Sequence, residues 1–232
     1  MPRSSVIVLS RDQSRRLDGQ VWDQLGLPTL VLMENAAAAL QRALPDSGTV
    51  VIVCGPGNNG GDGLALARRL AVSGRRSSVL LSSLPPRGAD ADVQRRLALM
   101  AGIVPRRVAP RRTPSVVVDA LFGTGLTRPV EGPELALIRW MNRCRDRGSR
   151  VIAADIPSGL DADVGEPIGG SEAVRAHLTV TFAALKPGLL TGTGKQHAGR
   201  IIVDRLGLPA ELIRSLAHQK KRPTREGRTL ER

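Results

Sequence analysis

Short apolar runs alternate with amphipathic stretches along most of the chain. Three β-branched runs, at 49–54, 116–119 and 151–154, are almost continuously apolar, which predicts strands buried on both faces of a parallel sheet. The same reasoning predicts further strands at 6–9, 79–81, 103–104, 178–182 and 201–203, and helices at 10–25, 29–44, 64–73, 91–101 and 133–147. Such strand–helix alternation is typical of an α/β fold, in which helices cover both faces of a mainly parallel sheet.

The length of the chain fits one domain. A chain of 232 residues can bury a full core without a second domain. We expect residues 1–215 to form this domain, whereas 216–232 are basic, lack apolar periodicity and are expected to be disordered. The absence of an apolar run of about 18 residues and of a basic-then-apolar start predicts a cytoplasmic protein. The two cysteines do not suggest a disulfide framework.

The formal net charge of +13 allows two interpretations. Strong positive charge attracts polyanions, including nucleic acids. However, proteins that bind nucleic acids usually combine basic residues with stacking aromatic residues, and this chain has two Phe, two Trp and no Tyr. The arginines are scattered in pairs, as at 15–16, 75–76 and 106–107. This pattern favours a solvated basic surface over a nucleic-acid-binding surface.

The glycine-rich segment 54–64 has the most informative composition in the chain. It follows the predicted strand at 49–54 and contains five glycines, two asparagines and an aspartate. No packing requirement for these residues is evident from the sequence. A glycine-rich turn before a helix brings backbone N–H groups and the positive end of the helix dipole to one place, which indicates a site for phosphate or another anion.

Two known phosphate-binding motifs do not account for this segment. A P-loop needs a lysine and a hydroxyl residue after its last glycine, but Asp62 and Gly63 follow Gly61. The G-x-G-x-x-G pattern of dinucleotide-binding proteins is present, but the apolar run at 79–81 ends in two serines and not in the acidic residue that binds ribose. A Rossmann-like NAD(P)-binding oxidoreductase is therefore disfavoured and is kept as an alternative.

Polar residues also follow two other predicted strands. Asp119 ends one strand and precedes the loop 123–125, and Asp155 leaves another strand and precedes Ser158. In an open parallel sheet, the carboxyl ends of the strands face one ligand crevice. Asn59, Asp119 and Ser158 could together supply oxygen ligands of mixed charge to a hard cation. Asp155 would then be free for proton transfer.

Four motifs together carry a resemblance to a known family. They are 32–36 (LMENA), 55–63 (GPGNNGGDG), 119–126 (DALFGTGL) and 155–160 (DIPSGL). With these motifs in this order, the chain resembles the NAD(P)H-hydrate epimerases from Ser10 to about Pro209, with Ala37 at a position where the family usually has glycine. The resemblance implies a Rossmann-like three-layer α/β/α sandwich. It also implies an isomerase that interconverts the R and S forms of hydrated NADH and NADPH.

Such enzymes act in the repair of nicotinamide cofactors. They prepare the S form for a separate ADP- or ATP-dependent NAD(P)H-hydrate dehydratase, so the resemblance implies this functional partner. It further suggests a homodimer. No membrane partner is expected, because the chain lacks a long apolar run, and the composition disfavours a nucleic-acid partner. The preference between hydrated NADH and hydrated NADPH stays open, and a non-catalytic protein that binds a partner or nucleic acid on this scaffold is a further alternative.

The resemblance also implies which residues form the site. Substrate contacts map to Asn58, Asn59, Gly60, Gly61, Asp62, Gly123, Thr124, Gly125, Leu126, Thr127, Arg128, Pro129 and Asp155. One potassium ion per subunit is implied at Asn59, Asp119 and Ser158. The reacting carbon carries a hydroxyl beside a ring nitrogen, so its inversion needs a proton donor and acceptor, and Asp155 is our candidate. Lys186 is either a second polar group over the site or an ordinary loop lysine.

Overall fold

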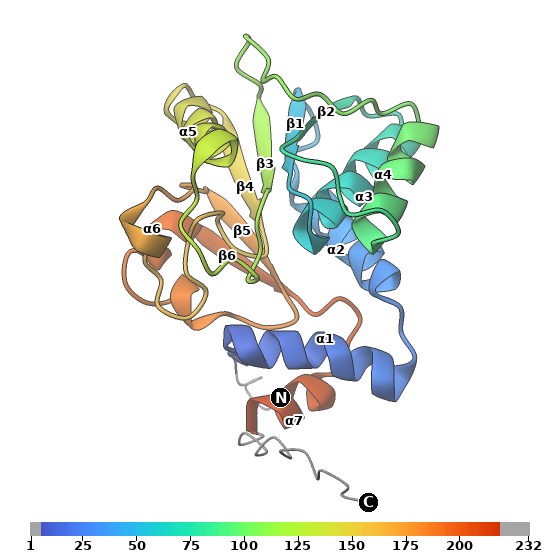
Figure 1. Ribbon diagram of the computed structural model, residues 1–232, viewed down its shortest axis with the longest axis vertical. Helices are drawn as coiled ribbons and strands as arrows, with labels where there is room; N and C mark the ends of the chain where they lie inside the picture. The colour runs from blue at the N-terminus through green and yellow to red at the C-terminus, as the bar shows by residue number, and fades with distance from the viewer. Residues whose placement is uncertain (1–5, 219–232) are drawn as a thin grey trace, which may run out of the picture.

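The computed structural model describes residues 6–218 and has three layers, with a central sheet between two layers of helices (Figure 1). Its six strands lie in the order β2-β1-β3-β4-β5-β6, and every neighbouring pair is parallel. This architecture confirms the predicted α/β sandwich. The strands are Val50–Cys54 (β1), Ser77–Leu81 (β2), Val116–Ala120 (β3), Arg150–Ala154 (β4), Leu178–Phe182 (β5) and Arg200–Asp204 (β6).

Helices cover both faces of the sheet because successive strand residues point to opposite faces. In β1, Val50, Ile52 and Cys54 join one apolar cluster, whereas Val51 and Val53 join another. The first cluster is covered mainly by α1 to α4, with a contribution from α7, and the second by α5. The helices are Arg11–Leu25 (α1), Thr29–Ala43 (α2), Asn58–Val72 (α3), Asp90–Met100 (α4), Gly132–Asp146 (α5), Gly194–Ala198 (α6) and Ala210–His218 (α7), with 3-10 turns at Ile168–Gly170 and Pro187–Leu189.

The strand order places a ligand crevice at the ends of β1 and β3. The chain leaves β1 toward β2 on one side, and then returns past β1 to β3 on the other. In open α/β sheets, ligands bind at such a reversal, outside the carboxyl ends of the strands. The segments that follow β1, β3 and β4 are the three segments in which the sequence places its unusual polar residues.

The glycines at the start of α3 are required by packing, contrary to the expectation from the sequence. A side chain at Gly55 would overlap the backbone oxygen of Leu121, and one at Gly60 would overlap the backbone oxygen of Gly55. At Gly63, a Cβ atom would lie 2.7 Å from both the Cβ of Ala120 and the Sγ of Cys54. These glycines therefore let the first turns of α3 lie directly against the ends of β1 and β3.

The helix that follows β1 also begins earlier than predicted. It begins at Asn58 and not at 64, so most of the glycine-rich segment is helix and not turn. Glycine lowers helix propensity, but the close contact of α3 with the sheet stabilises a helix at these positions. As a result, Asn58, Asn59 and Asp62 project from the first turns of a helix.

Two short predicted strands are absent from the sheet. In the predicted strand 6–9, only Val8 forms a β-bridge, with Leu185, because this segment pairs with the loop after β5 and not with a strand. The predicted strand 103–104 is a loop in which Val104 is 72% exposed. The nearby edge of β2 makes its one bridge to Arg106 instead.

The motif at 32–36 joins three helices. Glu34 on α2 forms ion pairs with Arg68 and Arg69 of α3 and accepts a hydrogen bond of 3.1 Å from Gln94 of α4. Ala37 is fully buried, so its methyl group is part of the core between these helices. This motif therefore stabilises the helical layer, and its Leu32, Met33 and Ala36 also line the cavity described below.

The carboxyl-terminal boundary of the domain differs from the expected one. Helix α7 ends at His218, so the boundary expected between 215 and 216 falls inside a helix. The expected disordered tail lies outside the described residues from 219 onward. Between residues 6 and 218, no helix has both the length and the apolar character needed to cross a bilayer.

Candidate functional site

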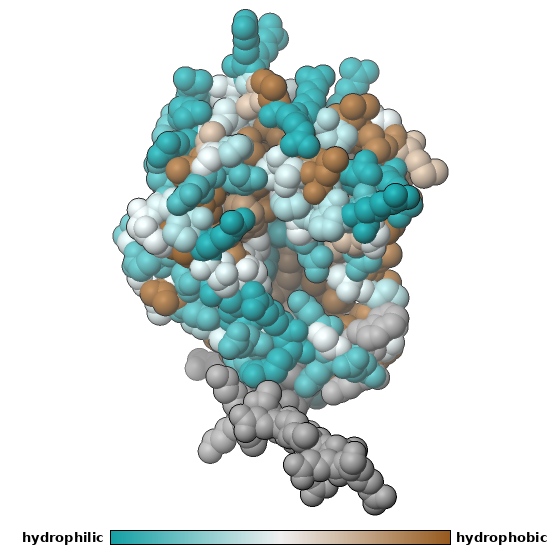
Figure 2. Space-filling model, in the orientation of Figure 1, coloured by the Kyte–Doolittle hydropathy of each residue, from teal (hydrophilic) through white to brown (hydrophobic). Residues whose placement is uncertain are grey.

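A cavity of about 560 Å³ lies at the carboxyl ends of β1, β3 and β4. Figure 2 shows the molecule hollowed at this place. Helix α1 closes one side of the cavity with Ser14, Arg15, Leu17 and Asp18. A capping box starts this helix, because Ser10 and Gln13 exchange backbone-to-side-chain hydrogen bonds of 2.8 and 3.3 Å.

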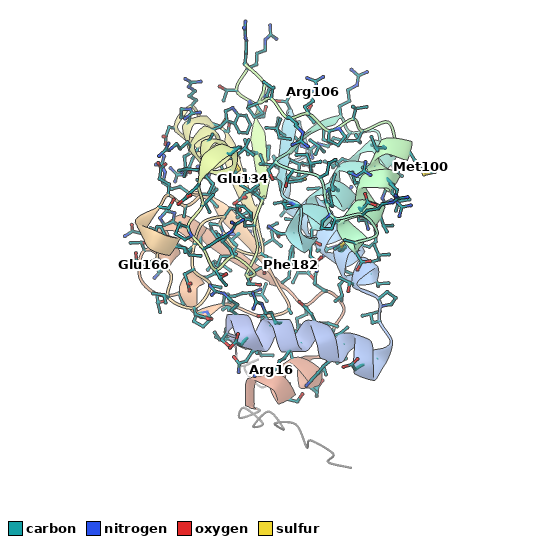
Figure 3. The ribbon with its side chains drawn as sticks, viewed as in Figure 1. Arg16, Met100, Arg106, Glu134, Glu166 and Phe182 are labelled. Carbon is teal, nitrogen blue, oxygen red and sulfur yellow. The ribbon has the colours of Figure 1, made fainter. Side chains whose placement is uncertain are left out.

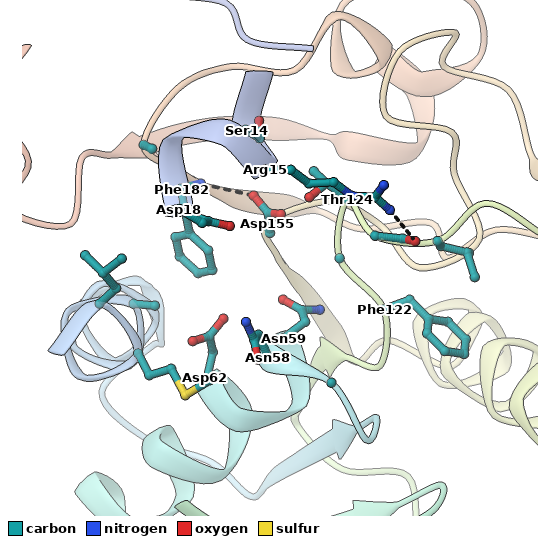
Figure 4. A pocket seen from close by; sticks show the side chains of 18 of the residues that line it. Ser14, Arg15, Asp18, Asn58, Asn59, Asp62, Phe122, Thr124, Asp155 and Phe182 are labelled. Atoms are coloured by element: carbon teal, nitrogen blue, oxygen red, sulfur yellow. Dashed lines mark hydrogen bonds between the residues drawn. The ribbon is translucent and has the colours of Figure 1, made fainter. Parts of the chain in front are cut away.

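Helix α1 is tied to the loops on the other side of the cavity. Arg11 forms an ion pair of 2.7 Å with Asp161, and its backbone N–H donates to Asp163 at 2.8 Å. The guanidinium of Arg15 donates to the carbonyl oxygen of Gly125 at 3.4 Å (Figure 4). These contacts connect α1 with the loops after β3 and β4, so segments far apart in the sequence form neighbouring walls of the cavity.

The structure brings most of the predicted substrate-contacting residues to this cavity. Gly60, Gly61 and Pro129 lie outside its lining, and the two glycines are buried beneath it. Their role as substrate contacts stays a prediction. The predicted residues that line the cavity are Asn58, Asn59, Asp62, Gly123, Thr124, Gly125, Leu126, Thr127, Arg128 and Asp155.

Asp155 is held in a strained backbone conformation at the end of β4. Its φ of 65° lies in the left-handed region, which is uncommon for a residue with a side chain and is found mainly at functional sites. Its Oδ1 accepts hydrogen bonds from Lys186, from Thr181 Oγ1 at 3.4 Å and from the Phe182 N–H at 3.3 Å. Its Oδ2 has no hydrogen-bond partner among residues 6–218 and faces Gly123. One oxygen is thus fixed, and the other is available to a ligand.

Lys186 positions this carboxylate. It is 2% exposed, and its ammonium group donates to Asp155, to Thr181 Oγ1 at 3.0 Å and to the Phe182 carbonyl at 2.8 Å. An ammonium group has three N–H donors, and these three acceptors use all of them. Lys186 is therefore a positioning residue for Asp155 and not an ordinary loop lysine.

Two of the residues predicted to bind a cation, Asp119 and Ser158, form a buried pair. Asp119 is fully buried and accepts hydrogen bonds from the Ser158 N–H at 2.8 Å and from Ser158 Oγ at 2.6 Å. Ser158 Oγ also accepts a hydrogen bond of 2.8 Å from the Phe122 N–H. Burial raises the pKa of Asp119 to about 6, although its hydrogen bonds favour the charged form.

The side chain of Asn59, the third residue predicted to bind the cation, lies in the lining of the cavity. It is 8% exposed, and neither its Oδ1 nor its Nδ2 has a hydrogen-bond partner among the described residues. Buried amides are almost always hydrogen-bonded, so the unpaired oxygen and nitrogen of Asn59 are available to a ligand. The carboxylate, hydroxyl and amide oxygens of Asp119, Ser158 and Asn59 are the ligand types that fit a hard cation.

The structure adds a carboxylate that the sequence reasoning missed. Asp18 of α1 lines the cavity beside Asp155 and across from Asp62 (Figure 4). Removal from bulk water, followed by the negative charge of Asp155, raises the pKa of Asp18 to about 6. The only local signal for Asp18 is an acidic residue directly after the buried Leu17.

Asp62 of α3 faces the same space from the opposite wall. Burial is the main cause that raises its pKa well above the ordinary value, and the charges of Asp155 and Asp18 add to this effect. A carboxyl group with a raised pKa keeps its proton to a higher pH than an ordinary aspartate, so Asp62 is suited to donate a proton to a ligand. The cavity thus contains three carboxyl groups and one buried ammonium group.

The raised pKa of Asp62 predicts a pH-dependent stability. The contribution of this group to folding is fully present below its ordinary pKa of 3.8 and is lost as the pH rises through its folded-state pKa. Asparagine does not ionise, so Asp62→Asn should not lose stability in this way as the pH rises. We therefore expect the melting temperature of the variant, relative to the unchanged protein, to be higher at pH 8 than at pH 4. If the variant and the unchanged protein differ in melting temperature by the same amount at pH 4 and at pH 8, the pKa of Asp62 is not raised by its surroundings.

The chain is similar to one protein family and to several proteins of known name. Residues 29–188 match the family model described as YjeF-related protein N-terminus. The NAD(P)H-hydrate epimerase of Limosilactobacillus fermentum is 39% identical over 197 residues, which cover 82% of this chain and 92% of that protein. The NAD(P)H-hydrate epimerase of Rhodopirellula baltica is 37% identical over 213 residues, or 88% of this chain and 85% of that protein.

Two further matches concern a longer protein and the fold. The bifunctional NAD(P)H-hydrate repair enzyme Nnr of Salinibacter ruber is 39% identical over 229 residues, which cover 87% of this chain but 41% of that protein. A solved structure of a yeast protein, ynu0 (YNL200c), has a TM-score of 0.75 at 22% identity and covers 90% of this chain and 93% of that chain. The second match supports the fold alone.

Proposed function

Because the chain belongs to the family of the YjeF-related protein N-terminus and the NAD(P)H-hydrate epimerases, we propose that it interconverts the R and S forms of hydrated NADH and NADPH. The observation that carries this function is the free Oδ2 of Asp155 at the wall of a dinucleotide-sized cavity. An epimerase needs a proton-transferring group at the reacting carbon, and Asp155 supplies one.

The reaction that we propose begins with loss of the hydroxyl from the carbon beside the ring nitrogen. The nitrogen lone pair forms a C=N bond as the C–O bond breaks, and the hydroxyl leaves as water after it receives a proton. Water then adds to the other face of the planar carbon and releases a proton. Asp155 is suited to transfer one of these protons because Lys186 holds its Oδ1 and leaves its Oδ2 free.

The remainder of the cavity is suited to a dinucleotide. Asn58 is exposed at the first turn of α3, where backbone N–H groups and the helix dipole favour phosphate. Arg128 is exposed at the rim and could pair with an additional phosphate. We propose that Asn58, Asn59, Asp62 and the segment 123–129 contact the substrate, and that Gly60 and Gly61 act through the shape of the helix start.

Potassium is the cation that we propose for Asn59, Asp119 and Ser158. The unpaired amide of Asn59 supports a ligand at this position, and the single carboxylate suits a monovalent ion. When bound, the ion supplies positive charge that offsets the buried carboxylate of Asp119. Asn59 and Ser158 would orient the start of α3, which also carries Asp62, and the loop after β4, which also carries Asp155.

Replacing Asn59 with alanine should weaken activation by potassium. The substitution removes one of three proposed ligands, so we expect the potassium concentration for half-maximal rate to rise at least about tenfold. The measurement is the epimerisation rate across a potassium series at constant ionic strength. Asn58→Ala is the matched control, because the neighbouring amide is exposed and should leave this concentration unchanged. A potassium-independent rate in the unchanged protein would contradict the proposal.

We also propose that the protein works with a separate ADP- or ATP-dependent dehydratase in the cytoplasm. Relatives named bifunctional NAD(P)H-hydrate repair enzyme include the proteins of Salinibacter ruber, Dictyoglomus turgidum and Thermofilum pendens, and this chain covers 39–42% of their length. A homodimer is the proposed assembly. Arg16 and Arg106 lie at opposite ends of the molecule (Figure 3), and this dispersal of basic residues does not favour a nucleic-acid partner.

A coupled assay tests this function. The protein is added to a mixture of both hydrate forms together with a dehydratase that accepts only the S form. We expect complete recovery of NADH or NADPH at a rate above that set by spontaneous epimerisation. If the R form is consumed no faster with the protein than without it, in the presence of potassium, the proposed function is wrong.

A further inference from the structure

The proposed reaction places different demands on the two faces of the substrate ring. The hydroxyl leaves from one face, and water arrives at the opposite face. Each event needs a group that gives or takes a proton, and one carboxyl on one side of a planar carbon cannot reach both faces. Asp155 therefore accounts for one half of the reaction, and the following inference rests on the proposed function.

Asp62 lies where the second group is needed. It projects from α3 into the cavity from the wall opposite Asp155, so that a flat ring between them would have one carboxyl on each face (Figure 4). Asp62 is 8% exposed, and it forms no hydrogen bond or ion pair with another residue between 6 and 218. A buried carboxyl that the fold leaves without a partner is available to a ligand.

The surroundings of the two carboxyl groups differ. Asp155 has a buried ammonium partner, Lys186, whereas the charged groups that act on Asp62 are the carboxylates of Asp155 and Asp18. Arg15 and Arg128 also line the cavity. Burial and the two negative charges raise the pKa of Asp62, so this group keeps its proton to a higher pH than an ordinary aspartate. Two carboxyls in such different environments are suited to act as acid and base in one reaction.

We propose that Asp62 is a second catalytic residue, which transfers the proton on the ring face opposite Asp155. From the form whose hydroxyl lies on the side of Asp62, its carboxyl donates a proton as the C–O bond breaks, and water leaves. A solvent water then bonds to the carbon on the other face and loses a proton to Asp155. One proton enters from Asp62 and one is removed by Asp155, and no atom changes oxidation state. The roles exchange in the reverse direction, and solvent restores the starting protonation.

Oxygen exchange distinguishes this mechanism from a single-group mechanism. In ¹⁸O-labelled water, a carboxyl can release the hydroxyl and return labelled water on its own face without inverting the carbon. Asp62→Asn should lower epimerisation by about 10²–10⁴-fold. It should still catalyse ¹⁸O uptake into one form, the form whose hydroxyl faces Asp155. Asp155→Asn should show the reverse preference, and mass spectrometry of the separated forms measures both.

Three controls distinguish a wrong role for Asp62 from a misfolded variant and from a wrong proposed function. Asp23→Asn is the matched control, because Asp23 is exposed on α1 outside the cavity, and it should behave as the unchanged protein. Melting curves establish that Asp62→Asn folds, and Asp62→Ser is a second variant that lacks the carboxyl. Near-normal epimerisation by Asp62→Asn, or equal loss of exchange in both forms, would overturn this inference while the proposed function stands. If the unchanged protein itself does not accelerate epimerisation, the proposed function is wrong.

Discussion

Asp155→Asn should lower the rate of epimerisation by about 10²–10⁴-fold, which is the usual contribution of a general acid or base. The asparagine side chain keeps the shape of aspartate but cannot transfer a proton at the position of Oδ2. It can still accept hydrogen bonds from Lys186 and the Phe182 N–H through its carbonyl oxygen. Ligand binding should therefore persist while turnover is lost.

The rate and the binding affinity have to be measured separately for this variant. Initial rates from the separated R form give turnover, and calorimetry with the equilibrated mixture gives affinity. Asp146→Asn is a suitable control, because Asp146 is an exposed residue of α5 that pairs with Arg175 and lies away from the cavity. A rate for Asp155→Asn close to that of the unchanged protein would remove Asp155 from the mechanism.

Gly60→Ala should destabilise the fold by about 3 kcal/mol or more, because the added methyl group overlaps backbone and not a movable side chain. Its Cβ would meet the carbonyl oxygen of Gly55 and would lie 2.6 Å from the carbonyl carbon of Gly55. Relief of this overlap requires α3 to move away from β1. For a domain of this size, the change corresponds to a fall in melting temperature of roughly 6–12 °C.

Gly57→Ala is the matched control for this prediction. Gly57 is the N-cap of α3 with a φ of −91°, and a Cβ there would meet no atom within 4 Å. We expect a change within about 1 kcal/mol, because the backbone conformation is open to alanine and the loss of a favourable cap is small. Thermal melts of both variants test the comparison. Equal melting temperatures would show that Gly60 is not required by packing.

The sheet could be predicted from the sequence because its strands are buried on both faces. The apolar runs at 49–54, 116–119, 151–154 and 178–182 leave little doubt about strand character, and each corresponds to a strand of the structure. The segment 6–9 has the same composition but pairs only with the loop at Leu185. Whether an apolar segment joins the sheet depends on long-range contacts, which local composition does not contain.

The glycine-rich segment shows where the residues were informative and where the interpretation was wrong. Its location at a strand end could be predicted, and so could the place of Asn59 and Asp62 at the cavity. The reason for its glycines could not, because Gly55 meets the backbone of Leu121, 66 positions along the chain. The same limit applies to Asp18, whose place in the site depends on how α1 crosses the cavity.

We propose that the cavity formed by α1, α3 and the ends of β1, β3 and β4 catalyses epimerisation of a hydrated nicotinamide dinucleotide. The most direct measurement starts from the purified R form of hydrated NADH and follows both forms by chromatography, with and without the protein, at neutral pH in potassium buffer. We predict that the protein brings the mixture to the same final ratio as the spontaneous reaction but in far less time. An approach to equilibrium at the spontaneous rate, with folded protein at saturating substrate, would show that this cavity does not catalyse the epimerisation.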